Sequence, residues 1–149
     1  MWLLYGTASA RPELPSDWRA IRLLAEVPAG PPRDALEHAE DEIAVPSEWV
    51  RGRVDVFAVR VVGESMFPHI REGDIVAVRA VPVPESGQVV VVDADDVADR
   101  GGQVKRFKRD PEGQPWLYSD NPAYPPRPMK EGARVAGVVV GLIRGPKAF

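Results

Sequence analysis

From residue 54 onward, apolar and polar residues alternate along the chain in a series of short stretches. Alternation with a period of two is typical of strands that bury one face. Turn-forming glycine, proline and asparagine residues separate the stretches. The pattern therefore predicts a mainly β, antiparallel domain with strands over 54–62, 74–79, 88–92, 103–109, 116–119 and 134–143.

The first third of the chain lacks this regularity. An apolar piece that ends at Gly6 is followed by a small, polar, proline-containing stretch, so we expect an arm or linker over 1–20. A mostly apolar run predicts a strand over 21–27, and the prolines within 27–32 exclude a helix there. The acidic stretch 34–42 predicts a short helix. One domain is expected over 21–149.

Composition excludes several classes of protein. The chain has 149 residues, which suits one domain, and its net charge of -3 argues against nucleic acid as its direct ligand. It has no cysteine and only His38 and His69, so we expect no metal and no cofactor. The longest apolar run, 135–143, is far shorter than the ~20 residues of a membrane span, and no signal peptide precedes it. These features predict a soluble, cytoplasmic protein with no membrane contact.

Ser65 lies in an irregular segment, 63–74, between two predicted strands. Gly63 permits an unusual backbone turn just before it. Such a turn can expose the hydroxyl and direct consecutive backbone N–H groups to one point, as an oxyanion hole requires. A β-turn with a capping serine is the simpler interpretation of the same residues. Both interpretations stand on the residues alone.

A nucleophilic serine needs a base, and two residues are candidates. His69 is close in sequence, but no carboxylate partner for its ring can be identified, and a surface histidine is the simpler interpretation. Alternation places Lys105 on the same strand face as Phe107, so Lys105 is buried if Phe107 is. Arginine cannot take this role because it keeps its proton. A surface lysine in a basic strand is the alternative.

The energy that such a lysine requires is large. A free lysine has a pKa of ~10.4, so about one molecule in 2,500 carries a neutral amine at pH 7. Lowering that pKa to about 7 costs roughly 4–5 kcal/mol of desolvation, which documented buried lysines reach. The fold must therefore provide an apolar pocket, to which Met66, Phe67 and Phe107 are the candidates.

Two further charged segments are weaker candidates. The aspartates of 93–99 suggest a calcium loop, but Val97 occupies a ligand position and the required glycine and glutamate are absent. We expect a solvated hairpin tip there. The basic cluster 105–109 is followed at once by Asp110 and Glu112, so it does not predict a nucleic-acid site.

Four elements, in order, resemble the LexA, phage CI-type repressor and UmuD family of self-cleaving serine peptidases. Val62-Gly63-Glu64-Ser65-Met66 with Pro68 and 72–78 resembles the nucleophile motif, and 104–108 resembles the catalytic-lysine strand. The stretches 118–125 and 135–141 resemble the C-terminal strands. Ala29-Gly30, with Gly30 lying 35 residues before Ser65, resembles the bond that these proteins cut in themselves. The resemblance covers about residues 21 to 145.

The resemblance implies a LexA/signal-peptidase-like β fold and a Ser-Lys dyad. Ser65 would be the nucleophile, Lys105 the neutral general base, and the backbone N–H groups of Ser65 and Met66 the oxyanion hole. The substrate would be the chain's own Ala29-Gly30 bond, whose glycine lets the backbone bend into the site. Because that bond is tethered, its effective concentration is high. Control would be conformational, with the cleavage segment moving in and burying Lys105.

The resemblance also implies partners. These are a second copy of the chain in a homodimer, RecA filaments on single-stranded DNA as the trigger, and operator DNA. DNA contact would require a helix-turn-helix domain, which is absent from this chain. Residues 2–6 resemble the last helix of such a domain. We therefore expect the C-terminal part of a repressor of the DNA-damage (SOS) or prophage-induction response.

Three alternatives remain open. The first is a UmuD-like accessory subunit of a translesion polymerase, which a natural start at Met1 would favour. The second is a catalytically silent dimerisation module, against which Ser65, Lys105 and Ala29-Gly30 all count. The third is a signal-peptidase relative that acts in trans, against which the absence of a membrane anchor counts.

The chain also departs from the family pattern in length, because it has extra residues near 99–102. These are expected to lengthen a hairpin without disturbing the site.

Overall fold

The computed structural model describes residues 15–25, 36, 39, 41–81, 83–93 and 103–145. Within these residues nine strands and one 3-10 turn, η1 (Ser47–Trp49), form, so the prediction of a mainly β fold is confirmed. No helix in this part of the chain is long and apolar enough to cross a membrane. The strands are β1 (Trp18–Leu24), β2 (Asp41–Pro46), β3 (Val56–Arg60), β4 (Ile75–Arg79), β5 (Val89–Asp93), β6 (Gln103–Arg109), β7 (Pro115–Tyr118), β8 (Arg127–Pro128) and β9 (Arg134–Ile143).

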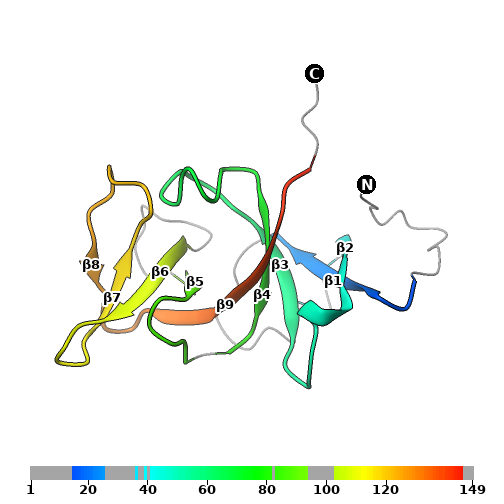
Figure 1. Cartoon of the computed structure of the whole chain (residues 1–149), viewed down its shortest axis with the longest axis horizontal. Coiled ribbons are helices and arrows are strands. Elements are labelled where there is room, and N and C mark those ends of the chain that lie inside the picture. The colour runs from blue at the N-terminus through cyan, green and yellow to red at the C-terminus, as the bar shows by residue number, and fades with distance from the viewer. Residues whose placement is uncertain are drawn as a thin grey trace.

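All nine strands belong to one sheet, in the order β2-β1-β3-β4-β9-β5-β6-β7-β8. Figure 1 shows β1 and β2 at one end of the molecule, β7 and β8 at the other, and β9 running between the two halves. The C-terminal half of β9 pairs with β4 and its N-terminal half with β5. Both pairings contain a register shift, and bulges of this kind bend a sheet. β9 therefore joins the two halves at a bend.

One strand pair departs from the predicted antiparallel pattern. β1 and β3 are parallel, whereas every other pair in the described sheet is antiparallel. The antiparallel pair of β1 and β2 explains this, because β2 ends at Pro46, opposite the residue at which β1 begins, Trp18. The chain thus enters β3 from the end at which it entered β1.

The six strands predicted from residue 54 onward correspond to β3 to β7 and β9, each within two residues of the expected bounds. Upstream the predictions are poorer. The strand expected over 21–27 begins at Trp18 and ends at Leu24, because backbone pairing with β2 extends it through exposed residues. Of the helix expected over 34–42, Leu36 is helical, but residues 41–42 begin β2, which was missed. The remaining residues of 34–42, apart from 39, lie outside the described residues.

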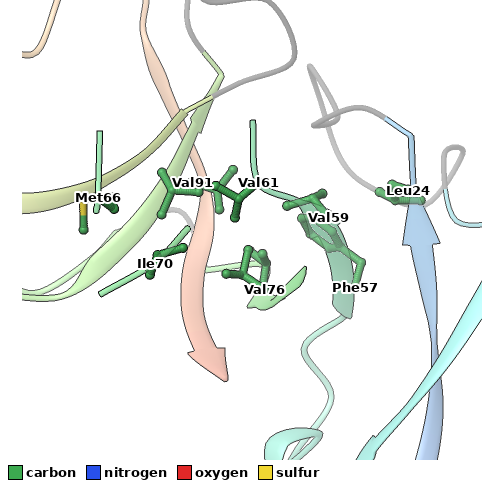
Figure 2. Close-up of a cluster of buried hydrophobic side chains, with 10 residues drawn as sticks. Leu24, Phe57, Val59, Val61, Met66, Ile70, Val76 and Val91 are labelled. Atoms are coloured by element: carbon green, nitrogen blue, oxygen red, sulfur yellow. The ribbon is translucent and has the colours of Figure 1, made fainter. Parts of the chain in front are cut away.

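One cluster of buried hydrophobic side chains lies beneath the segment between β3 and β4. Figure 2 shows Met66 and Ile70, from that segment, at one end of a buried cluster that extends to Leu24 of β1. Met66 is 1% exposed. Burying a side chain of this size contributes about 1.5–3 kcal/mol, so the segment that carries Ser65 is anchored from below.

Candidate active site

The segment between β3 and β4 is a closed loop with Ser65 near its start. At its base the Val61 N–H donates to the Asp74 carbonyl (2.7 Å) and the Gly73 N–H donates to the Val61 carbonyl (2.9 Å). Gly63 adopts a φ of +88°, and its N–H donates to Glu72 Oε2 (3.3 Å). Residues other than glycine rarely adopt this φ, so Gly63 does provide the unusual backbone turn.

The Ser65 hydroxyl points toward β6. The partly buried Oγ donates to the Val104 carbonyl oxygen at 3.4 Å, a long hydrogen bond. Val104 immediately precedes Lys105 in the strand. The backbone carbonyl of Ser65 accepts a hydrogen bond from the Asn121 N–H (3.0 Å). The structure therefore brings the predicted nucleophile next to the strand that carries the predicted base, 39 residues away in sequence.

Lys105 is buried, as the alternation in β6 predicts. The residue is 6% exposed and Phe107 is 2% exposed, whereas Lys108 is exposed. The Lys105 Nζ donates to Ser119 Oγ (2.8 Å) and lies 5.4 Å from the centre of the Tyr124 ring. Desolvation disfavours an ammonium relative to the neutral amine, whereas an aromatic ring over the amine favours the ammonium, so burial and the Tyr124 ring act on Lys105 in opposite directions.

A three-residue segment after β7, Ser119 to Asn121, touches both sides of the site. Ser119 accepts the hydrogen bond from Lys105. The Asp120 N–H donates to Met66 Sδ (3.5 Å), and the Asn121 side-chain amide donates to the Glu64 carbonyl (2.9 Å). Sequence reasoning did not assign these roles. The available signal was a polar run, Ser-Asp-Asn-Pro, directly after a strand.

Asp120 is the carboxylate partner of His69 that could not be found in the sequence. Its Oδ2 lies 3.0 Å from His69 Nδ1, and it also accepts two hydrogen bonds from Arg106, at 3.1 Å and 3.0 Å. The hydrogen bonds from Arg106 lower the pKa of Asp120 against the opposing effect of burial. His69 is an exposed side chain, and the Ser65 hydroxyl is directed at Val104 instead. Of the two candidate bases, Lys105 is buried and directly follows the residue that the Ser65 hydroxyl contacts, whereas His69 is exposed.

A buried carboxylate, Asp74, fixes the far end of the loop. It accepts hydrogen bonds from the Arg71 N–H (2.8 Å) and from Arg144 Nε (2.9 Å) and Nη2 (2.7 Å). Burial raises the pKa of Asp74, but the hydrogen bonds from Arg144 and Arg71 outweigh it, so that the pKa lies below its usual value. Arg144 follows β9 directly, so this ion pair ties the loop to the end of that strand.

The predicted cleavage site, Ala29-Gly30, lies outside the described residues, as does the expected hairpin tip after Asp93. Among the residues that the structure describes, no group of three or more His, Asp or Glu side chains is placed to hold a metal ion.

Comparison with known proteins gives a consistent picture. The sequence pattern of the Peptidase S24-like family matches residues 22–140, which include the loop, β6 and the segment after β7. The LexA repressor of Streptomyces avermitilis is 40% identical over 125 residues, covering 83% of this chain and 50% of the repressor. The LexA repressor of Mycolicibacterium smegmatis is 42% identical over 125 residues, covering 83% of this chain and 49% of the repressor. The chain thus spans about half the length of the curated relatives it matches.

Proposed function

The chain belongs to the Peptidase S24-like family, and from that premise we propose that it is a serine endopeptidase that cuts its own Ala29-Gly30 bond. Ser65 is the nucleophile and Lys105 is the general base. The observation that carries this proposal is the hydrogen bond from the Ser65 hydroxyl to the carbonyl of the residue before Lys105.

Acylation follows from what each group can do chemically. A neutral Lys105 amine takes the proton of the Ser65 hydroxyl as Oγ attacks the carbonyl carbon of Ala29. The backbone N–H groups of Ser65 and Met66 stabilise the oxyanion that forms. The resulting Lys105 ammonium then protonates the amine of Gly30, which leaves as the new N-terminus. Ala29 remains bound to Ser65 as an ester.

Deacylation uses the same base in reverse order. Water attacks the ester while the neutral Lys105 amine removes its proton, and the proton is then passed to Ser65 Oγ as the ester breaks. The Ala29 carboxylate departs and the hydroxyl is restored. For proton transfer the Ser65 hydroxyl must turn from the Val104 carbonyl, which it contacts in the structure, toward the Lys105 amine. Catalytic hydrogen bonds are commonly long before substrate binds.

The biological role that fits this chemistry is that of a repressor switch. The relatives are LexA repressors, so we propose that this chain is the self-cleaving and dimerising part of such a repressor. Cutting the Ala29-Gly30 bond would separate this part from DNA-binding heads, and dimeric operator binding would weaken. RecA filaments on single-stranded DNA are the proposed trigger. A UmuD-like polymerase subunit and a silent dimerisation module are the alternatives.

Intact-mass spectrometry of the purified chain, incubated from pH 7 to pH 10, tests the proposal. We expect two fragments, residues 1–29 and 30–149, that accumulate faster at high pH because more Lys105 is neutral. Ser65→Ala and Lys105→Ala are each expected to slow cleavage by at least about 1,000-fold, because dyad members act as a unit.

Two control variants make the result specific. Lys108→Ala removes an exposed lysine of the same strand, whose Nζ lies over the Tyr118 ring at 4.8 Å. Ser47→Ala removes a hydroxyl that donates to a carbonyl far from the site in sequence. Both are expected to cut at the normal rate. A chain that stays whole at every pH, even with RecA filaments added, contradicts the proposal and leaves dimerisation as the better account.

A further inference from the structure

Lys105 has a neighbour across the strand pair that sequence reasoning did not predict. Antiparallel pairing of β6 with β7 places Arg106 opposite Tyr118, and the same register continued by one residue brings Ser119 opposite Lys105. Residues directly opposite in an antiparallel pair share a face of the sheet. The 2.8 Å hydrogen bond from Lys105 Nζ to Ser119 Oγ is therefore built into the hairpin.

A hydroxyl has two properties that suit a general-base lysine. A neutral amine has two N–H groups and one lone pair, so accepting one N–H restricts where the lone pair points. A hydroxyl accepts that bond without a negative charge. A carboxylate in its place would stabilise the ammonium instead and hold the proton on the base.

A carboxylate does lie next to Ser119 in sequence, and the fold turns it away. Lys105 and Arg106 are consecutive in β6 and therefore point to opposite faces. Arg106 binds both oxygens of Asp120 and His69 binds one of them, so the negative charge is held on the Arg106 side. The Asp120 carboxylate is thereby held by Arg106 and His69.

We propose that Ser119 is the positioning residue of the dyad: its hydroxyl orients the Lys105 amine toward Ser65 while adding no charge. This inference rests on the proposed function, because it assigns a role within the same site. Tyr124 lies over the Lys105 amine. On the Arg106 face of β6, Asp120 binds Arg106 and His69, and Lys108 lies over the Tyr118 ring.

Three substitutions of Ser119 separate orientation from charge, with self-cleavage measured against pH. Ser119→Ala is expected to lower the limiting rate at high pH by about 10–100-fold, since a misdirected group costs that much. Ser119→Thr keeps the hydroxyl and should restore most of the rate. Ser119→Asp should move the midpoint of the pH profile upward by about 1–3 pH units, as an adjacent opposite charge does. Ser47→Ala serves as the control, and urea midpoints show that each variant folds.

A second measurement does not depend on cleavage. The chain has four lysines, at 105, 108, 130 and 147, so 13C-lysine labelling gives few resonances, and Lys105→Arg identifies the one that belongs to Lys105. Recorded in the Ser65→Ala background, this resonance should titrate at a higher pH in Ser119→Asp than with Ser119 intact.

The two claims fail in different ways. If the unsubstituted chain never cuts itself, the proposed function fails, and the Lys105 resonance still decides whether Ser119 controls that amine. If the chain cuts itself but Ser119→Ala matches it in both rate and pH profile, or Ser119→Asp leaves the Lys105 titration unmoved, the role of Ser119 is overturned.

Discussion

At the scale of single residues, the two candidate bases, Lys105 and His69, differ in their exposure to solvent. Lys105 is 6% exposed, whereas the His69 side chain is 70% exposed and lies against Asp120. Burial favours loss of a proton from an amine, whereas an exposed side chain such as that of His69 experiences no such desolvation. The same Asp120 carboxylate binds Arg106 through two hydrogen bonds, so the contact with His69 is one part of a surface network.

This assignment predicts the behaviour of His69→Ala. We expect self-cleavage to continue within a few-fold of the normal rate, because Lys105, the proposed base, is intact. The measurement is the rate of fragment appearance by intact mass at pH 8, beside Lys105→Ala. If His69→Ala abolishes cleavage while Lys105→Ala retains it, the histidine is the base and the dyad assignment is wrong.

The sequence predicted the unusual turn before Ser65 and the burial of Lys105, but it did not predict which residues form hydrogen bonds with them. The difference has a physical reason. A glycine before a serine and a lysine on an apolar strand face are local patterns. The contacts of Ser119 and Asn121 depend instead on the register of β6 against β7, which the turn between these strands sets. That register brings residue 119 to residue 105 only once the hairpin has formed.

At the scale of elements, the loop that carries Ser65 is held at both ends. Met66 and Ile70 anchor its first part in the core, and Asp74 anchors its last part to Arg144 after β9. A buried carboxylate that accepts three hydrogen bonds loses much of its stabilisation when one oxygen becomes an amide nitrogen. The loop therefore depends on Asp74 as well as on its apolar side chains.

Replacing Asp74 with asparagine tests this anchor. In the Ser65→Ala background, Asp74→Asn should lower the free energy of unfolding by about 1.5–3 kcal/mol, as measured by urea denaturation. The matched control is Asp55→Asn, since Asp55 is exposed and its carbonyl, which bonds to the Ala80 N–H, is unaffected. Equal urea midpoints for the two variants would show that the ion pair does not stabilise the loop.

The packing of η1 against β9 gives a second prediction at this scale. A Cβ placed at Gly141 would overlap the ring of Trp49, so the two elements meet at a position where only glycine fits. Gly141→Ala should cost about 1–3 kcal/mol through overpacking. In the Trp49→Ala background most of that cost should disappear, because the obstructing ring is gone. A double-mutant cycle in urea measures the coupling, and additive effects would refute the contact.

At the scale of the whole molecule, the prediction of a mainly β domain succeeded because short alternating or apolar stretches, separated by turn residues, recur from residue 54 to the end of β9. It failed where tertiary pairing decided the outcome. β2 alternates Ile43 and Val45 toward the core, yet its acidic start resembles that of a helix. The parallel pairing of β1 with β3 follows from the path of the chain and leaves no mark in local sequence.

Acid sensitivity is also a property of the whole molecule, because paired carboxylates fasten separate parts of it. Asp74 joins the loop to the end of β9, and Asp120 joins the segment after β7 to β6. The pKa of Asp74 is lowered chiefly by Arg144 despite burial, and that of Asp120 by Arg106. A carboxyl whose pKa is lower in the folded state stabilises the fold above its unfolded-state pKa, about 3.9. That stabilisation is lost as the pH falls through the folded-state value.

We therefore expect the urea midpoint of the Ser65→Ala chain to hold from pH 7 to about pH 5 and to fall steeply below about pH 4. The double variant Asp74→Asn, Asp120→Asn should start from a lower midpoint and decline less steeply, because two of the groups that take up protons on unfolding are gone. The measurement is the urea midpoint at half-unit steps from pH 7 to pH 2.5, with Asp55→Asn as the control. Parallel curves for the double variant and its parent would mean that these two ion pairs do not govern acid unfolding.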